Sequence, residues 1–230
     1  MKNLVVLSGA GISAESGLGT FRGNGGMWDR YPVEDICTPE GFVRNPELVL
    51  DFYNTRRMEM VKALPNHAHI KLAELERNFN VTVVTQNVDD LHERAGSSNV
   101  IHLHGELLKA TSSLNPNDRR QIRELNPDEY VIRIGDKASD GSQLRPFIVW
   151  FGEPVPNMEA AVPAVADADI LLVIGTSLNV YPAANLLYYV SDRAAVYLID
   201  PSPVNVRGQN ITVIEDVASR GIDRFCSLIM

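Results

Sequence analysis

Residues 4–23 read LVVLSGAGISAESGLGTFRG, a short apolar stretch that runs into a glycine-rich turn. In α/β proteins, a strand followed by such a turn brings backbone N–H groups close to a phosphate. Gly9 and Gly11 allow a tight turn and a close backbone approach, and Ala14 stands where the dinucleotide-binding fingerprint has its third small residue. The stretch therefore predicts a phosphate-binding turn; a glycine-rich loop without a ligand is the alternative.

The residues after this turn do not fit a dehydrogenase. Such an enzyme has an acidic residue about 20 positions further on, at the end of a second strand, but Glu34 and Asp35 follow a stretch without strand character. A long loop with Phe21, Arg22 and Trp28 intervenes, and long loops in compact domains are usually functional or disordered. Because its aromatic side chains argue against disorder, we interpret it as a loop that closes over a bound dinucleotide.

The length and composition are those of one ordinary globular domain. A chain of 230 residues, 45% of them hydrophobic and 22% charged, is long enough for a sizeable core. The net charge of −8 disfavours general nucleic-acid binding, which needs a basic patch, and no apolar run reaches membrane-spanning length. With no signal-peptide pattern, the chain is expected to be cytoplasmic, with Cys37 and Cys226 reduced.

Short apolar runs rich in β-branched residues alternate with helical segments. Helices are expected from Pro46, capped by Asn45, from about His67 to Arg77, and after Tyr181-Pro182. The expected strands are residues 4–7, 81–85, 100–103, 148–151, 170–174, 196–199 and 211–213. This alternation predicts a single α/β domain over residues 1–230 with a doubly wound parallel sheet. Segments at about 31–65 and 106–146 interrupt it, and we expect them to form a smaller lobe with a ligand cleft between the lobes.

Polar side chains follow two of the expected strands. Gln86, Asn87 and Asp89 come directly after residues 81–85, and the carboxyl ends of parallel strands are where such sheets bind ligands. Their amide and carboxylate groups can hold ribose hydroxyls and a carboxamide, although Asn87 or Asp89 can instead serve only as a helix N-cap. A second small turn, suited to a phosphate or a ribose, consists of Gly175, Thr176 and Ser177.

Two histidines lie on one face of an expected strand in the stretch His102-Leu103-His104-Gly105. Such a pair can bind a metal, pack as structural residues, or act in acid–base catalysis. No further histidine or carboxylate stands at a recognised zinc-ligand spacing. A structural pair and a catalytic histidine are therefore the main alternatives.

The ordered motifs GAGIS…TFRG, TQNxDxLH, HLHG and GTS resemble the sirtuin (Sir2-type) family of NAD-dependent protein-lysine deacylases, over residues 4 to about 200. The resemblance implies a Rossmann-like domain with a small inserted lobe, NAD as co-substrate, and acylated lysine in proteins or peptides as substrate. Nicotinamide, O-acyl-ADP-ribose and free lysine would be the products, and His104 matches the general base. Protein mono-ADP-ribosyl transfer and a non-catalytic NAD-binding module are the alternatives.

The resemblance also assigns residues to each ligand. Phe21 belongs to the lid that keeps water from the ribose, and the substrate peptide is expected to add as an extended strand. The expected NAD positions are Gly9, Ala10, Gly11, Ile12, Ser13, Phe21, Arg22, Trp28, Gln86, Asn87, Val88, Asp89, Gly175, Thr176, Ser177, Asp200 and Ala218. Asp200 departs from the asparagine-containing turn usual in the family, and we expect its carboxylate to bond an adenosine ribose hydroxyl, as acidic residues do in other dinucleotide sites. The expected peptide positions are Val149, Phe151, Gly152, Glu153, Asn179 and Val180.

The acyl group is suggested by Tyr53 and Arg56, which lie three residues apart and so share a face of the helix expected over residues 46–64. An arginine fork beside a phenol can bind a carboxylate. One sirtuin subclass with this Tyr-x-x-Arg pair, class III, prefers succinyl- or malonyl-lysine, and deacetylation is expected as a second capacity. Alternatively, Arg56 and Arg57 form one solvated basic face and Tyr53 lies in the core.

Many sirtuins hold a zinc ion with two Cys-x-x-Cys pairs in the small lobe, and this chain has no cysteine there. We therefore expect no metal and a lobe held by packing through Leu125, Tyr130, Ile132 and Ile134. As partners we expect acylated proteins or peptides, with no nucleic acid and no membrane, and the protein is expected to be a monomer.

Overall fold

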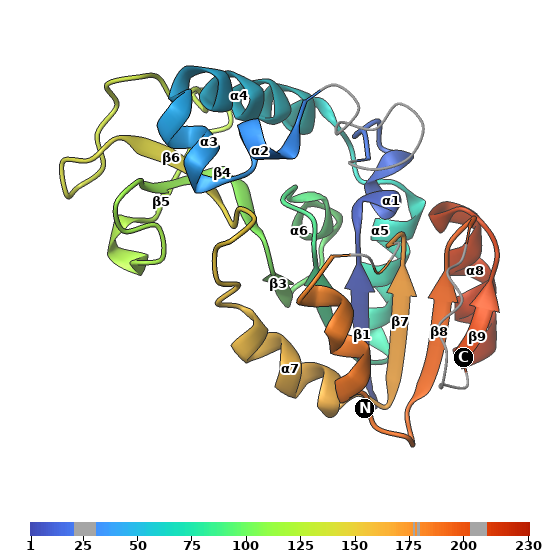
Figure 1. The fold of residues 1–230 in the computed structure, drawn as a ribbon. Helices are drawn as coiled ribbons and strands as arrows, with labels where there is room; N and C mark the ends of the chain where they lie inside the picture. Colours follow the sequence, from blue (N-terminus) through green and yellow to red (C-terminus); the bar gives the residue numbers. More distant parts are fainter. Residues whose placement is uncertain (21–30, 177, 179, 203–210) are drawn as a thin grey trace.

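The computed structural model describes residues 1–20, 31–176, 178, 180–202 and 211–230 (Figure 1). The predictions for Phe21, Arg22, Trp28, Ser177 and Asn179 lie outside the described residues.

Six parallel strands form the larger sheet, in the order β3-β2-β1-β7-β8-β9 (Figure 1). They are β1 (Asn3–Ser8), β2 (Asn80–Thr85), β3 (Val100–His102), β7 (Ile170–Ile174), β8 (Ala195–Ile199) and β9 (Ile211–Ile214). The chain builds outward from β1 on one side and then crosses over to build outward from β7 on the other. This reversal between β1 and β7 is the point where doubly wound sheets bind ligands. The predicted parallel α/β fold is confirmed.

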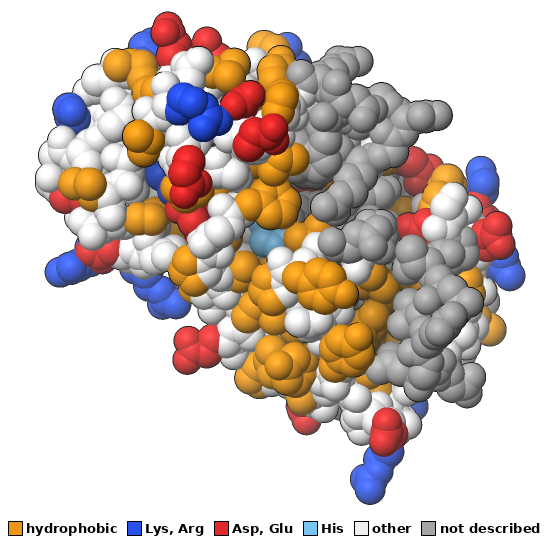
Figure 2. Space-filling model, viewed as in Figure 1, with side chains coloured by type: hydrophobic (Ala, Val, Ile, Leu, Met, Phe, Trp, Pro, Cys, Tyr) orange, Lys and Arg blue, Asp and Glu red, His pale blue; other side chains and the backbone are white. Residues whose placement is uncertain are grey.

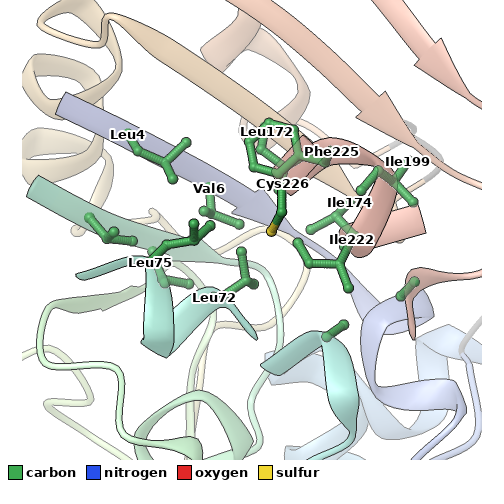
Figure 3. Packing of buried hydrophobic residues seen from close by; sticks show 14 of the residues in the cluster. Leu4, Val6, Leu72, Leu75, Leu172, Ile174, Ile199, Ile222, Phe225 and Cys226 are labelled. Atoms are coloured by element: carbon green, nitrogen blue, oxygen red, sulfur yellow. The ribbon is translucent and has the colours of Figure 1, made fainter. Parts of the chain in front are cut away.

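Both faces of this sheet are covered, which explains why its strands read as continuous apolar runs. Leu4 and Val6 point to the face covered by α5 (His67–Glu74) and α8 (Ala218–Ile229), as Figure 3 shows. The intervening Val5 and Leu7 pack in a second cluster, with α7 (Met158–Ala166) and the 3₁₀ helix η4 (Ala183–Tyr189). The predicted helix from about His67 to Arg77 is divided into α5 and the 3₁₀ turn η2 (Leu75–Arg77).

The smaller lobe is a three-stranded antiparallel sheet covered by the long helix α4 and two short helices (Figure 1). Its elements are α2 (Val33–Ile36), α3 (Pro39–Arg44), α4 (Pro46–Lys62), β4 (Gly105–Ser112), η3 (Arg119–Gln121), β5 (Arg123–Glu124) and β6 (Leu144–Ile148). The strand expected at 148–151 was wrong: β6 ends at Ile148 because Trp150 and Glu153 close a turn, with the Trp150 N–H donating to the carboxylate at 2.8 Å. The strand β4 was not predicted.

Three of the four residues expected to pack in the small lobe do so. Leu125 and Ile132 are buried and Tyr130 packs against them, but Ile134 is 55% exposed, so its predicted place in the core was wrong. Arg57 is fully buried and donates to the Leu107 carbonyl at 2.6 Å, which joins α4 to β4.

Local capping explains where α4 begins. The Asn45 side chain accepts a hydrogen bond from the Leu48 N–H at 3.1 Å, and Pro46 occupies the first turn, as predicted. The burial of Arg57 rules out a solvated basic face formed with Arg56, whereas Tyr53, the other part of that alternative, does belong to the buried cluster of the small lobe. None of the described helices is long and apolar enough to cross a bilayer.

Candidate active site

The glycine-rich turn packs against the turn that follows β7. Gly9 N–H donates to the Ile174 carbonyl at 3.1 Å and Gly11 N–H to the Gly175 carbonyl at 2.8 Å. A Cβ at Gly11 would lie 2.8 Å from the Gly175 Cα, and Gly175 itself has φ +62°, where a Cβ would overlap the Ile12 nitrogen. These glycines therefore permit a close approach between two turns, and two of the N–H groups expected to face phosphate bind protein carbonyls instead.

A cleft of about 560 Å³ opens beside these turns, between the larger sheet and the small lobe. A histidine is visible in the hollow where the two parts meet, with hydrophobic side chains around it (Figure 2). The predicted residues that line the cleft are Gly9, Ala10, Gly11, Tyr53, Gln86, Asn87, Val88, His104, Val149, Phe151, Gly152, Glu153, Gly175, Thr176, Val180 and Asp200. Segments far apart in the sequence thus meet at one site.

A smaller pocket shares Ala10, Asn87 and Val88 with the cleft, so the two cavities adjoin. The predicted residues Ser13, Arg56 and Asp89 line this pocket.

Two predicted NAD residues lie elsewhere. Ile12 and Ala218 are buried in the core between the sheet, α5 and α8, and neither lines the cleft or the small pocket. The Ile12 carbonyl accepts from the Asn66 side chain at 2.7 Å and its N–H donates to Gly9, so its backbone is also occupied. The apolar side chains of these two residues, at a strand end and at a helix start, belong to the core, and their contact with NAD stays a prediction.

His104 lies just beyond β3, next to the polar residues that follow β2. Its Nδ1 lies 3.0 Å from the Gln86 carbonyl, which can only accept, so Nδ1 carries the proton and Nε2 keeps a lone pair. Burial lowers the pKa of His104, although the hydrogen bond to Gln86 opposes the shift. The ring is therefore neutral at neutral pH and can accept a proton at Nε2.

His102 has a different environment. Its ring is buried, and Nε2 lies 2.7 Å from a Glu93 carboxylate oxygen. Burial lowers the pKa of His102, but the hydrogen bond and charge of Glu93 outweigh it and the net shift is upward. His102 is thus the structural member of the pair, and the two histidines do not act alike.

The small pocket is bordered by a buried hydrogen-bonded network. Ser13 Oγ donates to Asp89 Oδ2 at 3.0 Å and accepts from the Asn87 side-chain amide at 3.1 Å. Burial raises the pKa of Asp89, opposed by hydrogen bonds from Leu91 N–H and Ser13. Because Asp89 Oδ1 accepts from the Leu91 N–H at the start of α6 (Leu91–Ala95), one carboxylate both caps a helix and faces the pocket.

At the opposite side of the cleft, the Tyr53 hydroxyl accepts from Trp150 Nε1 at 3.0 Å and lies 3.5 Å from the Cys37 sulfur. Arg56, on the same helix, pairs with Glu59 at 2.7 Å. Sequence reasoning missed several cleft residues, among them Cys37, Trp150 and Tyr181. Trp150 stands between the predicted peptide residues Val149 and Phe151 and could have been found, whereas nothing local in the sequence marks Cys37.

The site has the shape and donor set that a dinucleotide requires. Glycine turns without side chains line one wall, amide and carboxylate groups border the adjoining pocket, and Asp200 lies at the end of β8. Among the described residues, no group of three or more His, Cys, Asp or Glu side chains is arranged to hold a metal ion.

Known proteins resemble this chain over nearly its full length. The Sir2 family model matches residues 9–182. A protein of Bacteroides thetaiotaomicron named NAD-dependent protein deacylase is 60% identical over 100% of this chain and 99% of its own. A Helicobacter pylori protein of the same name is 51% identical over 95% of this chain and 91% of its own. A solved Sir2 homologue bound to NAD shares 39% identity and superposes with a TM-score of 0.84, covering 98% of this chain and 88% of its own.

Proposed function

This chain belongs to the Sir2 family and is an NAD-dependent protein deacylase, and from that premise we propose that it prefers lysine acylated with succinyl or malonyl groups and also removes acetyl groups. The observation that supports this preference is the pair Tyr53 and Arg56, one helical turn apart on α4 at two adjoining cavities. The subclass with this pair is class III.

The two side chains offer complementary donors to a carboxylate. Tyr53 lines the cleft beside Trp150, and the mostly buried Arg56 lines the adjoining pocket. The ion pair between Arg56 and the half-exposed Glu59 leaves the guanidinium at the wall of the adjoining pocket. A hydrogen bond to a charged group contributes about 1.5–3 kcal/mol, which corresponds to an approximately tenfold to hundredfold preference for an acidic acyl group.

His104 is the proposed general base. NAD supplies the ribose carbon that receives the acyl oxygen, with nicotinamide as the leaving group. The Nε2 lone pair of His104 would take the proton from a ribose hydroxyl, while the Gln86 carbonyl keeps the ring in the required tautomer. The Ser13, Asn87 and Asp89 network would hold the nicotinamide side, and the apolar cleft wall would exclude water. The deprotonated ribose hydroxyl would attack the acyl carbon, and one water, admitted after nicotinamide has left, would be consumed as the lysine amine is released; the proposed products are nicotinamide, O-acyl-ADP-ribose and free lysine.

We further propose that the small lobe holds its shape without zinc. The support is the presence of only two cysteines in the chain, the apolar cluster between α4 and the small sheet, and the buried Arg57. Metal analysis of the purified protein should find less than stoichiometric zinc, and a chelator should leave the melting temperature unchanged. A stoichiometric metal whose removal unfolds the lobe would contradict this proposal.

The acyl preference is tested by Arg56→Met, with Arg56→Lys as the matched control that keeps the charge but loses the fork. Arg56→Met should lower kcat/KM for a succinyl peptide about tenfold to hundredfold and affect the acetyl form of the same peptide much less. Arg56→Lys should fall between wild type and Arg56→Met. Equal losses on both peptides would remove the carboxylate-receptor role, and transfer of label from NAD to protein without acyl consumption would favour ADP-ribosyl transfer instead.

A further inference from the structure

The Tyr53 hydroxyl has a partner on another element that orients it. Trp150, in the turn after β6, is nearly fully buried and donates from Nε1 to the Tyr53 oxygen at 3.0 Å. The two residues lie 97 positions apart in the chain, and both line the cleft. The contact therefore joins α4 to the turn that is expected to contact the substrate peptide.

Trp150 is held so that its N–H has one direction. The Arg145 guanidinium lies 3.4 Å from the centre of the indole ring, and the Phe42 ring also packs against it with 5.3 Å between centroids. Glu153 binds Arg145 through two bonds of 2.6 and 2.9 Å and accepts the Trp150 backbone N–H at 2.8 Å. A stacked arginine that is itself fixed by a carboxylate leaves the indole little freedom to rotate.

The fixed donor role of the indole N–H determines how the Tyr53 hydroxyl can hydrogen-bond. An indole N–H can only donate, so the phenol oxygen must accept from Trp150, and the single phenol proton remains for another acceptor. The Cys37 sulfur, 3.5 Å away, is a weak acceptor. Burial raises the pKa of Cys37 to about 11 and that of Tyr53 well above its usual value, so at neutral pH the phenol stays a donor and the thiol adds no negative charge.

We propose that Trp150 is a positioning residue for acyl selectivity, because its indole N–H orients the Tyr53 hydroxyl to donate to the carboxylate of an acidic acyl group. This inference rests on the proposed preference for succinyl- and malonyl-lysine. An acetyl group lacks this distal carboxylate, and its carbonyl oxygen is common to both kinds of acyl group, so Trp150 acts on the ratio of the two activities. Without the indole N–H, the phenol is free to turn its proton away from the carboxylate.

The test is Trp150→Phe, which keeps an aromatic ring beneath Arg145 and removes the N–H. The ratio of kcat/KM for succinyl over acetyl forms of one peptide should fall about fivefold to tenfold, mainly through a higher KM for the succinyl peptide. Phe42→Leu is the matched control, since it loosens the packing on Trp150 but keeps both the N–H and the Arg145 stack, and it should lower the ratio much less than Trp150→Phe does. If Trp150→Phe fails to fold, β-(3-benzothienyl)alanine at position 150 replaces only the N–H by sulfur and gives the same comparison.

A double-mutant cycle separates orientation from packing. Tyr53→Phe alone should lower the ratio, and adding Trp150→Phe to it should lower the ratio no further. An equal additional loss in the double variant, or an unchanged ratio in Trp150→Phe while Tyr53→Phe lowers it, would overturn the role of Trp150 and leave the proposed function standing. An unchanged ratio in both Tyr53→Phe and Arg56→Met would instead overturn the proposed function.

Discussion

The close packing of the two turns at the cleft predicts a large effect of Gly175→Ala. At φ +62° a residue with a Cβ costs about 1–2 kcal/mol. The added Cβ would also overlap the Ile12 nitrogen, and overpacking of this kind costs about 1–3 kcal/mol more. The summed loss of about 2–5 kcal/mol corresponds to a fall in melting temperature of about 4–20 °C for a chain of this size. Because the clash pushes apart the turns that form one cleft wall, NAD affinity should fall at least about tenfold.

The matched control is Gly141→Ala, in a loop of the small lobe. Gly141 has φ +83°, but a Cβ there would meet no atom within 4 Å, so only the backbone cost applies. Thermal unfolding of both variants and calorimetric titration with NAD separate the two contributions. A similar loss of melting temperature in both variants, together with unchanged NAD affinity in Gly175→Ala, would refute the close-approach argument.

Three further predictions concern charge and protonation. His104→Ala should lower nicotinamide release about 10²–10⁴-fold. Because burial lowers the pKa of His104, kcat/KM of the wild-type protein should decline only below about pH 6.5. A decline that begins above that pH would contradict the assignment of His104 as the general base. Glu153→Gln leaves the buried Arg145 charge unpaired and should cost about 3–5 kcal/mol in urea unfolding, whereas a change below about 1 kcal/mol would argue against the buried pair. Burial lowers the pKa of His69 to about 4 and that of its neighbour His92 well below the usual value. Because the unfolded chain therefore binds more protons in acid than the folded chain does, the free energy of unfolding should fall as the pH drops from about 6.5 towards 4. The loss should reach up to about 3 kcal/mol for His69. Equal stability at about pH 7 and about pH 5 would be inconsistent with neutral buried rings.

The larger sheet could be predicted because its signals are local. β1, β2 and β7 are short β-branched runs buried on both faces, and α4 begins with an asparagine cap and a proline. The small sheet could not be predicted in the same way. β4 pairs with β6, and the paired residues Ala110 and Pro146 lie 36 positions apart in the chain, so no local pattern reports their contact.

The candidate site also contains residues that local sequence signals predict and contacts that only tertiary packing creates. Gln86, Asn87, Asp89 and His104 follow strands, and the rule that parallel strands present ligands at their carboxyl ends brings them together. A motif describes a stretch of chain and not the direction of each side chain, so it did not reveal that the Ile12 side chain enters the core. The bond between Trp150 and Tyr53 depends on tertiary packing between α4 and a distant turn, which no local pattern contains.

The most direct test of the account is nicotinamide release by the wild-type protein with one lysine peptide in four forms: unmodified, acetylated, malonylated and succinylated. We expect release to require an acyl group, to be fastest in kcat/KM for the succinyl and malonyl forms, and to be lost in His104→Ala. Release that is equally fast with the unmodified peptide, or an acetyl form preferred over both acidic forms, would contradict the account.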